Sequence, residues 1–145
     1  PYSTNSVDMI FSSHFLEHFS YEDGLKFLKE CRRVLKPGGL VRLVVPDADL
    51  LVQYRCDNYG DLNDFNEIND ECEKAKTQAA KLHALLYGSD HKAIYDQETL
   101  SEQLREAGFV SHPQKFRTSV YSQMLIESLD SFPCLSLYME GGYSV

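Results

Sequence analysis

The sequence is short of basic residues, and this shortage removes one class of partner. Its 145 residues include 14 lysines and arginines against 22 aspartates and glutamates, which gives a formal net charge of −8 at pH 7. Because a chain with this balance has no broad positive field to attract phosphate backbones, a nucleic-acid partner is not expected. A small-molecule substrate is the better expectation.

Cysteine pairs, targeting signals and long apolar runs are missing too. The four cysteines stand far apart and form no C-x-x-C motif. No stretch has the pattern of a secretory signal or the length of a membrane span, so we predict one domain in the reducing cytoplasm, not in a membrane. The chain opens on Pro1 instead of an initiator methionine, which predicts a start inside a longer protein. The cysteines, interpreted as small core residues, are Cys31, Cys56, Cys72 and Cys134.

Two apolar runs joined by a helical pattern form the clearest unit of the sequence. Residues 7–11 and 40–45 are short, continuous and apolar, as in strands that are buried on both faces. Between them, Ser20 can cap a helix that the Pro-Gly-Gly turn at 37–39 ends. A strand, helix and strand in this order predict a right-handed crossover in a parallel sheet, and hence the α/β class.

Residues 49–88 have a helical pattern that Gly60 is expected to break into two helices. Within it, residues 57–73 hold seven acids and no base. We interpret this run as a solvated helix face, because its spacing does not fit a calcium-binding loop.

The C-terminal part predicts one helix and two strands. Asp96 is expected to cap a helix over 97–107, and a strand over 109–118 follows, interrupted by Pro113. The alternation in residues 135–140 predicts a last strand with one buried face beside an antiparallel neighbour.

Four segments together resemble a known family. Asp8–Phe19 and Arg33–Asp47 resemble the fourth-strand and fifth-strand motifs of class I S-adenosylmethionine-dependent methyltransferases, in the same order and spacing. Thr99–Phe109 and Ser136–Glu140 look like the sixth-strand approach and the terminal antiparallel strand. The resemblance implies a partial doubly wound Rossmann-like sheet, mostly parallel with a C-terminal antiparallel strand. It also implies S-adenosylmethionine as cofactor, and residues 1–145 would be the C-terminal part of the domain, with a helical insertion over about 49–88.

The resemblance is to small bacterial methyltransferases, some of which look linked to surface-sugar synthesis, so a small molecule or a glycan is the implied acceptor. The glycine-rich loop that follows the family's first strand has no counterpart, because the chain contains no G-x-G. We therefore expect an incomplete cofactor site in these residues, with a non-catalytic binding or assembly module as the alternative function. We also expect a homodimer through the exposed first strand.

Polar residues just beyond the carboxyl ends of the two apolar strands are the candidate site. In open α/β sheets the ligand lies at this edge. By resemblance, Ser12, Ser13 and His14 would flank the methionine part of the cofactor, and Asp47 would face the acceptor. The alternative for Asp47 is that it caps the next helix. His91 is a candidate base, because the unperturbed pKa of a histidine is close to neutrality.

His14, Glu17 and His18 also fit the H-x-x-E-H expression of zinc peptidases. A zinc hydrolase is therefore a further hypothesis, which we disfavour because the motif follows a strand at once instead of lying within a helix. We expect no metal here, and we expect Glu17 and His18 to hold the strand-to-helix turn by hydrogen bonds.

Overall fold

The computed structural model describes residues 2–56, 74–88, 90–120, 128–131 and 135–142. The predicted crossover unit is present. Strand β1 (Val7–Ser13) leads through a single 3-10 turn, η1 (Leu16–His18), into helix α1 (Tyr21–Val34), and strand β2 (Leu35–Pro46) follows without a gap. β1 and β2 pair in parallel, as expected for a crossover.

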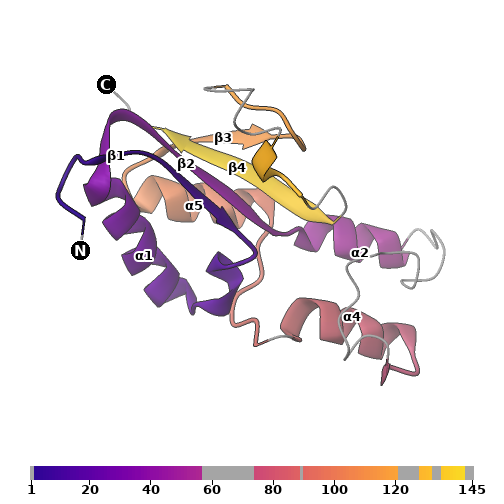
Figure 1. The fold of residues 1–145 in the computed structure, drawn as a ribbon. Helices are drawn as coiled ribbons and strands as arrows, with labels where there is room; N and C mark the ends of the chain where they lie inside the picture. The colour runs from indigo at the N-terminus through magenta and orange to yellow at the C-terminus, as the bar shows by residue number, and fades with distance from the viewer. Residues whose placement is uncertain (1, 57–73, 89, 121–127, 132–134, 143–145) are drawn as a thin grey trace.

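The described strands form one open sheet in the order β1-β2-β4-β3 (Figure 1). Strand β4 (Ser136–Gly142) lies between β2 and β3 (Val110–Gln114) and is antiparallel to both. β1, β2 and β3 therefore run in one direction and β4 in the other. This arrangement confirms an α/β fold with a partial Rossmann-like sheet and a C-terminal antiparallel strand.

Helices α1 and α5 (Gln97–Glu106) cover one face of the sheet (Figure 1). Both begin as predicted, because the side chains of Ser20 and Asp96 accept hydrogen bonds from the backbone N–H groups of Asp23 and Thr99. Their apolar sides pack on alternate residues of β2 in a continuous core. Residues central to that core are Leu28, Cys31, Val41, Leu43, Val45, Leu100, Leu104 and Met139.

The other face of the sheet buries an ion cluster. Arg42 of β2 lies opposite Glu140 of β4, and both are fully buried together with Asp130. The guanidinium donates from Nε to Asp130 Oδ1 at 3.0 Å and from Nη1 to Glu140 Oε1 at 3.2 Å. It also donates to the carbonyl oxygens of Thr118 and Lys115, at 2.8 and 3.3 Å. The cluster thus fastens the segment after β3 onto the sheet.

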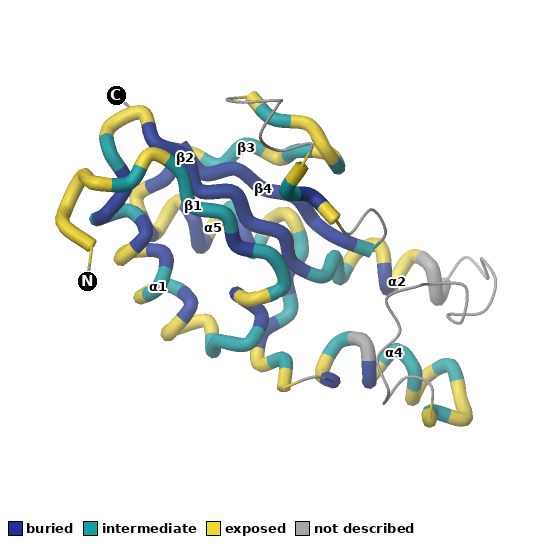
Figure 2. The backbone as a smooth tube through the Cα atoms, viewed as in Figure 1, coloured by how far each residue is buried: buried dark blue, intermediate teal, exposed yellow. Residues whose placement is uncertain are grey.

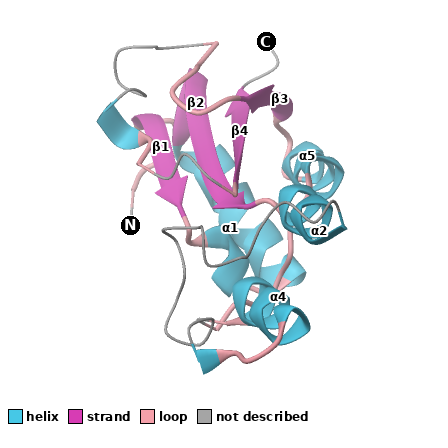
Figure 3. Ribbon diagram, turned by 90° about the vertical axis from the view of Figure 1, so that its right-hand side faces the viewer, coloured by secondary structure: helices cyan, strands magenta, loops and turns pink. Residues whose placement is uncertain are grey.

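Helices α2 (Ala48–Cys56) and α4 (Gln78–Tyr87) lie beyond the end of the sheet where β1 and β2 finish (Figures 1 and 3). They account for the two ends of the helical stretch predicted over 49–88. Gly60 and the acidic run over 57–73 lie outside the described residues. In the part of the chain that the structure describes, no helix combines the length and the apolar character that a membrane crossing needs.

Three predicted strand boundaries or faces need correction. β2 begins at Leu35 instead of residue 40, because Leu35 already pairs with Val7 ahead of an irregularity in β1. β3 is shorter than predicted, with Pro113 inside it at an exposed position. β4 is buried on both faces, not one (Figure 2), because its polar residues are covered: Glu140 binds Arg42.

Candidate functional site

The carboxyl ends of β1 and β2 bring the predicted cofactor residues together. Ser12 pairs with Leu43 and Ser13 with Val44, so both serines stand at the last residues of the parallel pair. Their hydroxyl oxygens are buried and make no hydrogen bond among the described residues. A buried hydroxyl without a partner is costly. The two hydroxyls therefore suit a polar ligand at this edge of the sheet.

His14 connects the ends of three strands. Its backbone is in the left-handed region, with φ of 48°, and its N–H donates to the Val44 carbonyl oxygen at 2.8 Å. The imidazole Nε2 lies 3.2 Å from the hydroxyl oxygen of Ser136, the first residue of β4. The Nδ1 atom lies 3.5 Å from a carboxylate oxygen of Glu17. The ring is therefore held from both sides at the edge where Ser12 and Ser13 end.

Asp47 follows β2 directly and lies at the same edge. Its N–H donates to the Leu135 carbonyl oxygen at 2.8 Å, and its carboxylate accepts from the Leu50 N–H at 3.2 Å. The second contact is the capping interaction that the sequence offered as an alternative. Burial raises the pKa of Asp47, and the Leu50 N–H opposes this in part. A role toward an acceptor stays a prediction.

His91 lies next to His18, with ring centroids 5.0 Å apart and planes at 70°. Its Nδ1 is 3.3 Å from the Leu86 carbonyl oxygen. Burial lowers the pKa of His91, and the Glu17 carboxylate opposes that effect. His91 also lines a cavity of about 10 Å³ with Pro46, the residue before Asp47. The structure thus brings His91 to the 17–18 turn, and its role as a base remains untested.

Glu17 corrects the expectation that its side chain holds the turn. The residue is 1% exposed, yet neither carboxylate oxygen makes a hydrogen bond. The backbone does the holding, because the Glu17 carbonyl oxygen accepts from the N–H groups of Lys92 and Ala93 at 2.8 and 3.1 Å. The zinc-peptidase hypothesis is not supported by this geometry, since η1 is a single 3-10 turn and not an α-helix.

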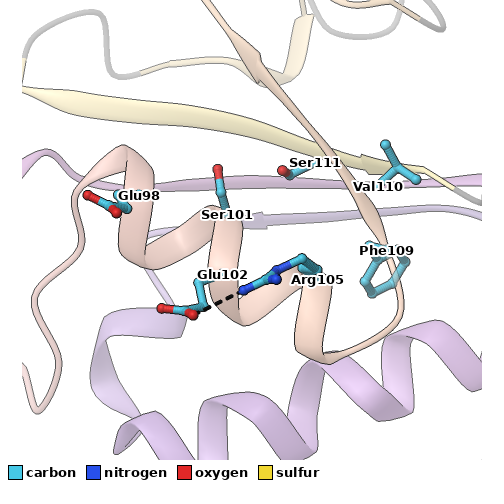
Figure 4. A pocket seen from close by; sticks show the side chains of 7 residues that line it. All are labelled: Glu98, Ser101, Glu102, Arg105, Phe109, Val110 and Ser111. Atoms are coloured by element: carbon cyan, nitrogen blue, oxygen red, sulfur yellow. Dashed lines mark hydrogen bonds and ion pairs between the residues drawn. The ribbon is translucent and has the colours of Figure 1, made fainter.

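A larger groove lies elsewhere, between α5 and β3 (Figure 4). Its volume is about 450 Å³, and an exposed ion pair of 3.0 Å joins Glu102 and Arg105 on its wall. Because β3 and β1 are at opposite ends of the strand order, this groove is separate from the Ser12 edge. It is lined by Glu98, Ser101, Glu102, Arg105, Phe109, Val110 and Ser111.

Two residues of the site region could not be found by pattern. Ser136 meets His14 across 122 positions of sequence. Tyr95 forms a backbone β-bridge with Asp47, and its hydroxyl donates to Gln103 Oε1 at 3.0 Å. These two contacts fix the segment that carries His91.

Part of this sequence is similar to a known family. The sequence model of a family described as a methyltransferase domain matches residues 1–43. These residues contain β1, α1 and the first part of β2. The comparison with curated proteins gives no match.

Solved structures share the fold. An S-adenosylmethionine-dependent methyltransferase of Archaeoglobus fulgidus is 15% identical with a TM-score of 0.52, and the match covers 97% of this chain and 61% of that one. A second such methyltransferase, of Thermotoga maritima, is also 15% identical, with a TM-score of 0.56. That match covers 99% of this chain and 59% of the other. A Haloferax volcanii methyltransferase, solved in complex with the Trm112 methyltransferase activator, is also 15% identical with a TM-score of 0.56, over 100% and 57%.

The chain therefore spans about three fifths of the length of these three proteins. At such low identity the structures show the fold alone. The sequence match at the N-terminal end agrees with them, and both agree with the strand motifs. Residues 1–43 thus match a methyltransferase domain family, and the chain shares the Rossmann-like fold of S-adenosylmethionine-dependent methyltransferases.

Proposed function

We propose that the natural protein transfers a methyl group from S-adenosylmethionine to a small molecule or a glycan, and that these residues form the C-terminal part of its domain. The observation that carries the proposal is the pair of buried, unpartnered hydroxyls of Ser12 and Ser13 at the end of β1. They lie at the edge of an open α/β sheet where ligands bind. The absence of G-x-G from the sequence and the partial coverage of the relatives support a site completed by other residues.

The residues at this edge have separate tasks in the proposal. Ser12 and Ser13 hydrogen-bond the polar part of the cofactor, and His14, held by Ser136 and Glu17, closes the same wall. When bound, S-adenosylmethionine supplies the electrophilic methyl group. Most of the acceleration of such a transfer comes from positioning.

Asp47 is the proposed contact of the acceptor. A carboxylate whose pKa is raised by burial is a stronger proton acceptor, which suits a hydroxyl or amine that must lose a proton on methylation. The reducing cytoplasm remains our proposal for localisation, and the free, buried thiol of Cys31 is compatible with it.

Titration calorimetry of the natural protein with S-adenosylmethionine tests the proposal. We expect binding, and we expect Ser12→Ala and Ser13→Ala each to weaken it by roughly 2- to 10-fold, the worth of one neutral hydrogen bond. Ser101→Ala is the matched control, because Ser101 lines the separate α5–β3 groove, and it should leave the affinity unchanged. If the natural protein does not bind the cofactor, the non-catalytic module becomes the better hypothesis.

A further inference from the structure

A cluster of one carboxylate and two imidazoles lies where the 17–18 turn meets the segment before α5. Glu17, His18 and His91 each offer one ligand atom, and these atoms all lie within 4.8 Å of one another. We propose that the three side chains form a binding site for a divalent transition-metal ion, of which zinc is the best match. This inference does not depend on the methyltransferase proposal.

The state of Glu17 is the first reason. Its carboxylate is 1% exposed, has no hydrogen bond and has only a 3.5 Å approach from His14 Nδ1. Burying a carboxylate with so few partners is unfavourable. Its carboxylate nevertheless lies where the ring nitrogens of His18 and His91 converge. A cation bound between the three would supply the missing charge and the missing bonds.

The second reason is that the cluster is built by the backbone. The paired hydrogen bonds from Lys92 and Ala93 to the Glu17 carbonyl oxygen hold two segments together that are more than 70 positions apart in the sequence. His91 comes directly before this pair, and the edge-to-face contact of its ring with His18 follows from that placement. The three ligands are therefore positioned by the fold and not by chance surface contact.

The orientation of His91 is the third reason. Its Nδ1 faces the Leu86 carbonyl oxygen at 3.3 Å. A histidine that ligates a metal through one ring nitrogen usually donates the other N–H to a carbonyl or a carboxylate, which fixes the ring and its tautomer. His91 has this arrangement, with Nε2 as the ligating atom. His14 has a comparable place beside Glu17, where it would orient the carboxylate.

The ligand set selects the metal. Two imidazoles and one carboxylate are typical of zinc sites with three protein ligands and an open fourth position, whereas magnesium and calcium prefer oxygen ligands alone. The cavity of about 10 Å³ beside Glu17 and His91 has room for about one water molecule. A water molecule would complete the coordination there.

Metal analysis of the untagged natural protein, purified without chelators, is the first test. We expect about one zinc ion per chain. The metal-free protein is then titrated with zinc in competition with a chromophoric chelator, and with cobalt, whose visible absorption reports four-coordinate binding by nitrogen and oxygen. Zinc binding is read without S-adenosylmethionine, so its failure would leave the cofactor experiment unaffected.

Variants locate the ion. Glu17→Gln and His91→Phe should each weaken zinc binding by at least about 10-fold, because even outer partners of a metal ligand cost that much. His83→Ala on α4 is the matched control, since His83 is exposed and outside the cluster, and it should bind zinc like the natural protein. Circular dichroism checks that each variant is folded. If Glu17→Gln does not fold, the zinc affinity of His91→Phe and the cobalt spectrum of the natural protein show whether the ion binds at this site.

Three results would overturn the proposal. The first is natural protein that takes up neither zinc nor cobalt. The second is a folded Glu17→Gln or His91→Phe variant with unchanged affinity, and the third is equal loss in His83→Ala.

Discussion

Replacing Arg42 by methionine is expected to destabilise the fold more than any surface change. Methionine keeps much of the volume of the side chain but removes its charge from between Asp130 and Glu140, which are both fully buried. It also removes the Arg42 hydrogen bond to the Thr118 carbonyl oxygen and one of the hydrogen bonds that the Lys115 carbonyl oxygen accepts. Breaking a buried ion pair by removing one partner costs about 3–5 kcal/mol. Here two carboxylates lose one partner, so we expect the upper end of that range.

Urea unfolding of the natural protein, followed by circular dichroism, measures this loss. Lys26→Met is the control, because Lys26 pairs with Glu22 and Asp23 on the exposed side of α1, so its removal should change the urea midpoint little.

Adding Asp130→Asn and Glu140→Gln to Arg42→Met should restore part of the stability, since the uncompensated charges are then gone. A loss below about 1 kcal/mol for Arg42→Met would show that the cluster does not hold the sheet face together, and the reasoning would fail.

Three further predictions concern packing, pH and association. Gly141→Ala should cost about 1–3 kcal/mol in urea unfolding, because the added Cβ would stand 2.8 Å from Val41 Cγ1; a neutral result would mean that β4 shifts freely. Burial raises the pKa of the Cys31 thiol to about 12, so the unfolded chain ionises at lower pH than the folded one. Stability should therefore fall from about pH 8.5 upward, and less so in Cys31→Ala, as urea midpoints at pH 8 and 10 would reveal. If these 145 residues are produced alone, sedimentation should show self-association through β1, and Met9→Lys should reduce it; a strictly monomeric species refutes this.

Local signals made much of the fold predictable. The caps at Ser20 and Asp96 are short-range chemistry, and both are present as expected. The apolar runs at 7–11 and 40–45 were long enough to indicate buried strands, and the rule that parallel strands end at one edge placed Ser12 beside the end of β2. These predictions required only the identity of residues close in sequence, or the direction in which a strand runs.

What could not be predicted depends on contacts between distant segments. Glu17 faces His91 because the chain returns to η1 after the long helical stretch, and no local pattern encodes that return. Arg42 lies within the run predicted as an apolar strand, and its partners Asp130 and Glu140 lie 88 and 98 positions away. For the same reason, β4 was assigned one buried face although its polar side chains are covered on the other.

The proline in β3 has a consequence for how the sheet can grow. β3 ends the strand order on one side, and Pro113 sits inside it opposite Met139 of β4. A proline has no N–H to give to an added strand, which is why prolines are confined to sheet edges. β1 ends the order on the other side and contains no proline. The two edges of this sheet are therefore unequal: a further strand, from the same polypeptide or from another copy, meets no proline beside β1, whereas β3 has one N–H fewer to offer it.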